Sequence, residues 1–103
     1  MGAEARQAYL VEHYRPGVDV ETLREWAERV RDAAAELERQ GKAVRYLRST
    51  IVPADEALLC TLEATSEAHV REVYARAGIP FERLSRVIAD EPGAAVGKRR
   101  AKE

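Results

Sequence analysis

The chain has 103 residues, of which 46% are hydrophobic and 34% are charged. This length suits one domain, and the apolar fraction is high enough to exclude a chain that is disordered throughout. The 17 Lys and Arg nearly balance the 18 Asp and Glu, and a net charge of −1 supplies no field that would draw in nucleic acid or an anionic membrane.

The first predicted element is a strand over residues 8–14. Its odd positions, which include Val11 and His13, alternate with even positions that include Glu12 and Tyr14. Side chains two apart share one face of a strand, so these two pairs should point to opposite faces.

A long helix is predicted next, with Asp19 as its N-cap and Glu21 in its first turn. Apolar residues recur every three or four positions from Leu23 to Leu37. That spacing is typical of a helix with one face buried on a core. The helix should end at Gly41, because glycine accepts the left-handed conformation that is common at helix C-termini.

Residues 44–52 and 58–64 predict two more strands. The connection between them, residues 53–56, has the length and the Pro and Asp content of a hairpin loop, so the two strands should pair antiparallel. Cys60 lies in the second of them and has no basic neighbour in sequence that would lower its pKa. We expect it to be a buried structural thiol.

A second helix is predicted after Ser66, which suits an N-cap, and it should end at Gly78. A last strand follows over residues 84–89, and beyond it the composition shifts to Gly, Ala, Lys and Arg. We therefore assign residues 7–90 to one domain and residues 91–103 to a mobile basic tail.

The β-α-β-β-α-β order predicts a ferredoxin-like α+β fold. In this fold a four-stranded antiparallel sheet, in the spatial order fourth, first, third and second strand, carries both helices on one face. The other face is left uncovered and meets either water or a second subunit. Two such sheets packed face to face make a dimeric α/β barrel, which is the architecture that we expect.

Strict alternation divides the strand residues between the two faces. The helix side receives an apolar set: Val11, Leu47, Ile51, Leu58, Cys60, Leu62 and Val87. The uncovered side receives a mixed set: Leu10, Glu12, Tyr14, Val44, Tyr46, Arg48, Thr50, Val52, Leu59, Thr61, Glu63, Leu84, Arg86 and Ile88.

In this arrangement Glu12 neighbours Arg86, and Glu63 lies diagonally from Arg48. A face that combines matched charges with large apolar side chains predicts a buried interface or a ligand site. The candidate ligand-binding residues are Glu12, Tyr46, Arg48, Glu63 and Arg86. Salt bridges across a dimer interface are the simpler role for the same charges.

Five short segments carry a resemblance to a known family. They are RYLRSTIVP at 45–53, CTLEA at 60–64, ARAGIPF at 75–81, LVE at 10–12 and PG at 16–17. Together they resemble the small bacterial proteins catalogued as domain of unknown function 4242 and often labelled nickel-binding. The resemblance spans Tyr9 to Ala89, and it implies a ferredoxin-like fold, a homodimer and, for some members, divalent nickel bound by surface histidines.

The resemblance also implies where metal ligands should lie. Metal-binding members tend to carry histidines around the Arg-Ala-Gly turn, where this chain has Tyr74 and Ile79, and neither side chain is a nickel ligand. His69 and Glu72 are three residues apart, so they share a helix face and form half of a surface site. Together with His13, they are the candidate ligands for nickel or another divalent metal.

The main functional hypothesis is a small homodimeric module that binds a divalent metal ion or a small-molecule ligand and needs no other cofactor. The alternative, by analogy with other dimeric ferredoxin-like barrels, is a cofactor-independent isomerase, cyclase or oxygenase acting on aromatic or polyketide-like molecules. Its acid–base candidates are Glu12, His13 and Tyr14. A protein interaction module is the third hypothesis.

Composition also predicts the compartment and the classes of partner. The first residues lack the apolar core of a secretory signal, and no apolar run reaches membrane-spanning length. A single cysteine agrees with a reducing compartment. We expect a cytoplasmic protein with no membrane partner. Nucleic acid is not expected either, because the basic cluster of the tail is short and lacks aromatic residues.

Overall fold

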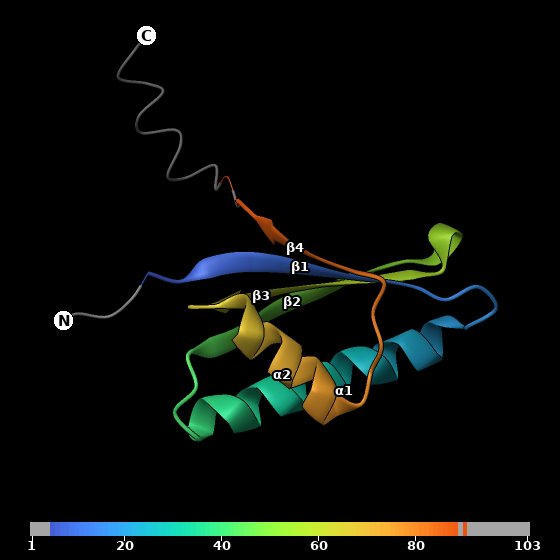
Figure 1. Cartoon of the computed structure of the whole chain (residues 1–103). Coiled ribbons are helices and arrows are strands. Elements are labelled where there is room, and N and C mark those ends of the chain that lie inside the picture. Colours follow the sequence, from blue (N-terminus) through green and yellow to red (C-terminus); the bar gives the residue numbers. More distant parts are fainter. Residues whose placement is uncertain (1–4, 89, 91–103) are drawn as a thin grey trace, which may run out of the picture.

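The computed structural model describes residues 5–88 and 90, and its elements follow the predicted order (Figure 1). The strands are β1 (Gln7–Tyr14), β2 (Val44–Val52), β3 (Ala57–Ala64) and β4 (Arg83–Val87). The helices are α1 (Val20–Arg39) and α2 (Glu67–Ala77), and a short 3₁₀ helix, η1 (Pro53–Asp55), joins β2 to β3. The predicted basic tail over residues 91–103 lies outside the described residues, as does Ala89, the predicted end of the last strand.

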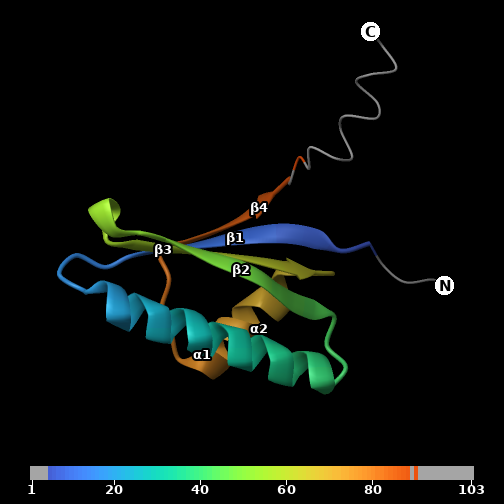
Figure 2. The same ribbon diagram turned by 180° about the vertical axis from the view of Figure 1, so that it is seen from behind.

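The sheet is antiparallel and has the predicted strand order, β2-β3-β1-β4. Both helices lie on the same face of it, as the two opposite views show (Figures 1 and 2). This is the ferredoxin-like α+β arrangement. The other face, called the uncovered face below, is not covered by any described element. No helix among the described residues is long and apolar enough to cross a membrane.

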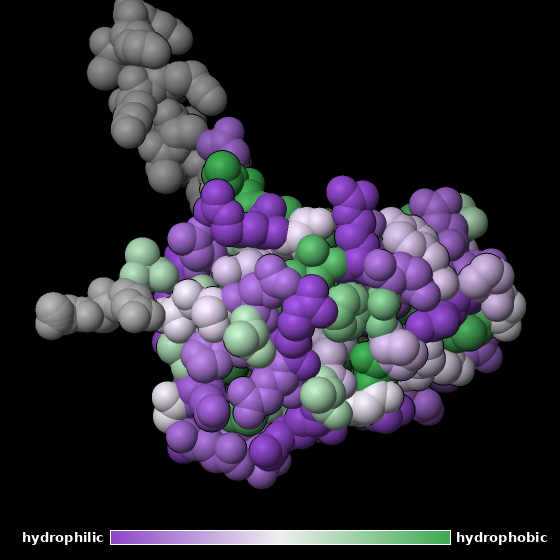
Figure 3. Space-filling model, viewed as in Figure 1, coloured by the Kyte–Doolittle hydropathy of each residue, from purple (hydrophilic) through white to green (hydrophobic). Residues whose placement is uncertain are grey.

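The core fills the space between the sheet and the helices. Its largest fully buried side chains come from all three layers: Val11, Leu23, Val30, Leu37, Val44, Leu58, Cys60, Leu62, Val70 and Val73. The predicted apolar stripe of α1 is confirmed, since its buried residues recur at three- and four-residue intervals. Viewed as in Figure 1, the outer surface over the helices is mainly hydrophilic (Figure 3).

The two helices begin differently. Asp19 Oδ1 accepts a hydrogen bond from the Thr22 N–H at 2.9 Å, so the predicted side-chain cap of α1 is confirmed. Ser66 holds the cap position of α2, but its side chain makes no cap hydrogen bond within the described structure. Its carbonyl accepts the His69 N–H instead, at 3.2 Å. Gly78 ends α2 as predicted, in the left-handed conformation with φ of 71°.

A β-bulge in β2 overturns part of the predicted division between faces. The pairing register skips one position between Tyr46 and Arg48, which makes Leu47 the extra residue. Tyr46 therefore joins the buried Val44 on the helix side, and Leu47 is 38% exposed. The prediction placed Val44 and Tyr46 on the uncovered face and Leu47 in the core, because strict alternation has no place for a bulge.

The faces of β4 are also opposite to the prediction. Leu84 pairs with Val11, which is buried under the helices, and directly paired residues share a face. By the same register Arg86 pairs with Tyr9 and lies on the helix side. Val87 therefore lies on the uncovered face. This register appears only in the pairing of β4 with β1, and no periodicity within the strand encodes it.

The two helix starts predict unequal effects of cap removal. Asp19→Ala should lower the free energy of unfolding several times more than Ser66→Ala, because only Asp19 satisfies an N–H group of the first turn with its side chain. The hydrogen bond to Thr22 lowers the pKa of Asp19, so this contribution is present at neutral pH and should disappear as the pH falls below about 4. Urea unfolding of both variants at pH 7 and pH 3 measures this, and equal losses at pH 7 would contradict the different caps.

Candidate functional site

Strand β1 separates the three predicted acid–base residues. Consecutive strand residues point to opposite faces. Glu12 and Tyr14 point to the uncovered face, whereas His13 is fully buried beneath the helices. The three side chains therefore do not line one cavity, and their catalytic roles stay a prediction.

On the uncovered face, Glu12 is the centre of a polar cluster. Its Oε1 accepts a hydrogen bond from the Tyr14 hydroxyl at 2.5 Å, and its Oε2 lies 3.8 Å from Arg83 Nε. Only 14% of the Glu12 side chain is exposed, although no described element covers this face. The hydrogen bond and the carboxylate charge both raise the pKa of Tyr14. Arg83 occupies the position beside Glu12 that was predicted for Arg86, because the register of β4 differs from the prediction.

The other predicted ligand-binding residues are divided between the two faces. Arg48 pairs with Thr61, so Glu63, two residues further along β3, is its diagonal neighbour on the uncovered face, as expected. Tyr46 and Arg86 lie on the helix side. The structure therefore does not bring the five predicted residues together, and the prediction of one site on one face is corrected for Tyr46 and Arg86.

His13 is the buried polar residue of the described core, with no exposed surface. Its Nδ1 lies 2.9 Å from the carbonyl oxygen of Leu58 and must donate there, because a carbonyl only accepts. Its Nε2 has no hydrogen-bond partner among the described residues. The ring packs against Tyr74 and Trp26, at centroid distances of 5.4 and 6.3 Å. Burial lowers the pKa of His13, so the neutral imidazole is the stable form inside the fold.

A short chain of hydroxyl and thiol groups crosses the helix side of the sheet. The Tyr46 hydroxyl lies 2.5 Å from Ser49 Oγ, and Ser49 Oγ lies 3.1 Å from Cys60 Sγ. Burial raises the pKa of the Cys60 thiol, which the bond to Ser49 only partly opposes. The Tyr74 hydroxyl, which neighbours Cys60, is buried without a hydrogen-bond partner in the described structure, and burial raises its pKa too. A protonated, inaccessible thiol agrees with the structural role predicted for Cys60.

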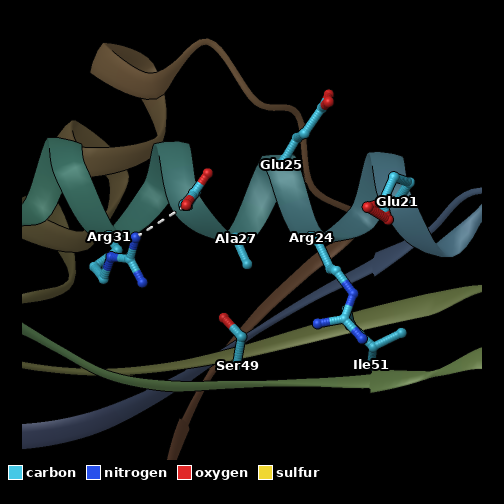
Figure 4. A pocket seen from close by; sticks show the side chains of 8 residues that line it. Glu21, Arg24, Glu25, Ala27, Arg31, Ser49 and Ile51 are labelled. Atoms are coloured by element: carbon cyan, nitrogen blue, oxygen red, sulfur yellow. Dashed lines mark ion pairs between the residues drawn. The ribbon is translucent and has the colours of Figure 1, made fainter.

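A groove of about 600 Å³ opens between α1 and the edge strand β2 (Figure 4). Ser49 and Ile51 form its floor, Ala27 faces them from α1, and Arg24 and Arg31 lie on either side. The sequence does not predict this groove, because the spacing of Arg24 and Arg31 indicates only the solvent-exposed face of a helix. Its depth depends on how far the helix stands from the edge of the sheet. Neither this groove nor a smaller one beside α1 and α2 is lined by the predicted catalytic residues.

The structure also separates the predicted metal ligands. His13 is sealed in the core, while His69 lies in the first turn of α2. Glu72 forms an ion pair with Lys42, with a distance of 3.6 Å between Glu72 Oε1 and Lys42 Nζ. Within the part of the chain that the structure describes, no three His, Cys, Asp or Glu side chains gather closely enough to hold a metal ion. One subunit therefore does not supply a complete nickel site from these residues.

Burial of His13 predicts a specific dependence of stability on pH. A histidine whose folded pKa is lowered stabilises the fold above its unfolded pKa of about 6.5, and this stability is lost as the pH falls. The free energy of unfolding should be flat above about pH 7 and fall by up to about 1.4 kcal/mol per pH unit below 6.5. Glu82 opposes this shift and Arg15 adds to it.

Urea unfolding between pH 5 and 8 measures this dependence. His13→Asn keeps a donor toward Leu58 and cannot titrate, so the fall should be absent in this variant. The matched control is His69→Asn, which removes the other histidine and should retain the fall. An unchanged profile in His13→Asn would contradict the assignment.

The chain matches a known protein family over most of its length. Over residues 9–87 the chain matches a family model described as nickel responsive protein SCO4226-like, which is consistent with the resemblance found in the sequence. It is similar in fold to the crystal structure of SCO4226 from Streptomyces coelicolor A3(2), with a TM-score of 0.62 and 20% identity over 82% of this chain and 99% of that one. No curated protein matches the chain. Because the family model covers most of its length, the chain belongs to the SCO4226-like family of nickel-responsive proteins.

Proposed function

We propose that the protein is a homodimer that binds a divalent metal ion such as nickel, or a small ligand, and that its subunits associate through the uncovered faces of their sheets. The observation that carries this proposal is the mixed character of that face. Leu10, Leu59 and Val87 lie on it, half-buried by their neighbours. Removing their remaining surface from water favours association by about 25 cal/mol per Å² of apolar area.

The charges on this face also support the dimer. Glu12 already has Arg83 and the Tyr14 hydroxyl as partners within its own subunit. A carboxylate that is paired before association loses less on desolvation than an isolated one. A second copy of the same face is therefore a suitable partner, because it adds apolar contact and does not leave an unpaired charge at this position.

The family match supports the metal part of the proposal. The described residues offer His69 and Glu72 for it, on one side of α2 by their spacing of three. Lys42 competes with any cation for the Glu72 carboxylate. A pair of donors that is partly neutralised in this way predicts weak binding, completed by water or by groups outside one subunit.

The dimer is tested with Leu59→Lys. Leu59 pairs directly with Glu12 across β1 and β3, so the new ammonium can reach that carboxylate and a single subunit can still fold. A dimer through this face would have to bury the added charge. Sedimentation at micromolar concentration should show a dimer for the wild type and at least about a 100-fold larger dissociation constant for the variant.

The matched control is Glu25→Lys, which adds a lysine on the exposed outer side of α1. It should leave the dimer unchanged. A wild-type chain that sediments as a single subunit, or a Leu59→Lys protein that stays dimeric, would contradict the proposed interface.

The metal is tested by calorimetric titration with nickel chloride. His69→Ala should weaken nickel binding at least about tenfold, and Lys42→Gln should strengthen it because it releases the Glu72 carboxylate. The control is His13→Asn, which should bind like the wild type because His13 is sealed in the core. An absence of heat with the wild type would end the metal part of the proposal and leave the dimer untouched.

A further inference from the structure

We propose that the groove between α1 and β2 binds a small zwitterion of the amino-acid type, holding its carboxylate at Arg24 and its ammonium at Ser49 and the acidic side chains of α1. The groove lies on the helix side of the sheet. Neither the dimer nor the metal proposal involves its residues, so this inference stands apart from both.

The size and lining of the groove suit a small organic molecule. A volume of about 600 Å³ lies within the range of about 300–1,000 Å³ that is typical of small-ligand sites. Ala27 and Ile51 give it apolar walls on opposite sides, one from the helix and one from the strand (Figure 4). These walls can receive a hydrocarbon side chain while polar groups at the sides orient the ligand.

Arg24 is the anchor for a carboxylate. Its side chain descends from α1 toward Ile51 at one end of the groove (Figure 4). No ion pair to Arg24 forms within residues 5–88 and 90, whereas Arg31, two helical turns away, lies 3.5 Å from a Glu28 carboxylate oxygen. A guanidinium group stays charged at every physiological pH and matches a carboxylate with two parallel donors.

The Ser49 hydroxyl can present an acceptor to the groove. Its hydroxyl has one proton and lies within hydrogen-bond distance of both the Tyr46 hydroxyl and the Cys60 thiol. When Ser49 donates to one of these groups and accepts from the other, one lone pair remains, and Ser49 lines the floor of the groove. In that arrangement a ligand donor, such as N–H, suits the position above Ser49.

The charges of the rim select a ligand that carries both signs. Glu21 and Glu28 also line the groove, and Glu28 is paired with Arg31, while the third lining carboxylate, Glu25, points away from the floor (Figure 4). A simple anion would be repelled by the carboxylates. A simple amine would leave Arg24 without a counterion. A molecule that carries a carboxylate and an ammonium on the same carbon atom offers a partner to Arg24 and to the carboxylates.

The test compares three probes of one shape by NMR titration of the ¹⁵N-labelled full chain. L-leucine carries both charged groups, 4-methylpentanoate lacks the ammonium, and 3-methylbutylamine lacks the carboxylate. L-leucine should shift the backbone amides of Ala27, Ser49 and Ile51. Its dissociation constant should be at least about tenfold lower than that of either single-charge probe.

Two variants and a control assign the contacts. Arg24→Gln should weaken L-leucine binding at least about tenfold and leave 3-methylbutylamine unaffected, and Ser49→Ala should weaken L-leucine binding less. The control Arg39→Gln removes an exposed arginine in the last turn of α1, away from the groove, and should change nothing. The proposal is overturned by equal shifts from all three probes, by full binding in Arg24→Gln, or by no shift at about 20 mM L-leucine.

Discussion

The alternation of side chains along strands that are covered on one face only is the constraint on which the rest of this structure depends. It sends His13 into the buried core and its two neighbours, Glu12 and Tyr14, to the opposite face. Residues that are adjacent in sequence therefore lie in different environments, one in the core and the others on the uncovered face. Burial disfavours the charged form of the His13 imidazole and lowers its pKa, whereas the Glu12 side chain has the Tyr14 hydroxyl and Arg83 as partners.

The fold could be predicted because its determinants are local. The stripe of α1, the Asp19 cap and the Gly78 terminus each lie within one element, and crossover rules then fix the strand order. The two errors concern relations between strands. The bulge at Leu47 appears only in the pairing of β2 with β3, and the face of Leu84 only in the pairing of β4 with β1. Neither is encoded by the period of a single strand.

The candidate site was less predictable for the same reason. A sequence pattern shows that Arg24 lies on the wet side of a helix, but it does not show that this side overhangs an edge strand. Similarly, Ser49 gains its importance from contacts with Tyr46 and Cys60, which need the bulged register to bring them together. The sequence shows the charge and polarity of these residues, but only the tertiary arrangement shows that they line one groove.

Because the chain belongs to a nickel-responsive family, the question is which side chains of this fold are free to bind a metal ion. Apart from His69, the predicted metal ligands and the thiol of Cys60 already make contacts within the fold. His13 donates to Leu58 with Nδ1 and its ring packs against Tyr74. Burial keeps the Cys60 thiol protonated beside Ser49, and Glu72 pairs with Lys42. A metal ion bound at His13, Cys60 or Glu72 would have to break one of these contacts. Binding at His13 or Cys60 would require the folded core to open, because both side chains are fully buried. The surface of α2, where His69 and Glu72 lie, is therefore the place where a metal ion would disturb the fold least.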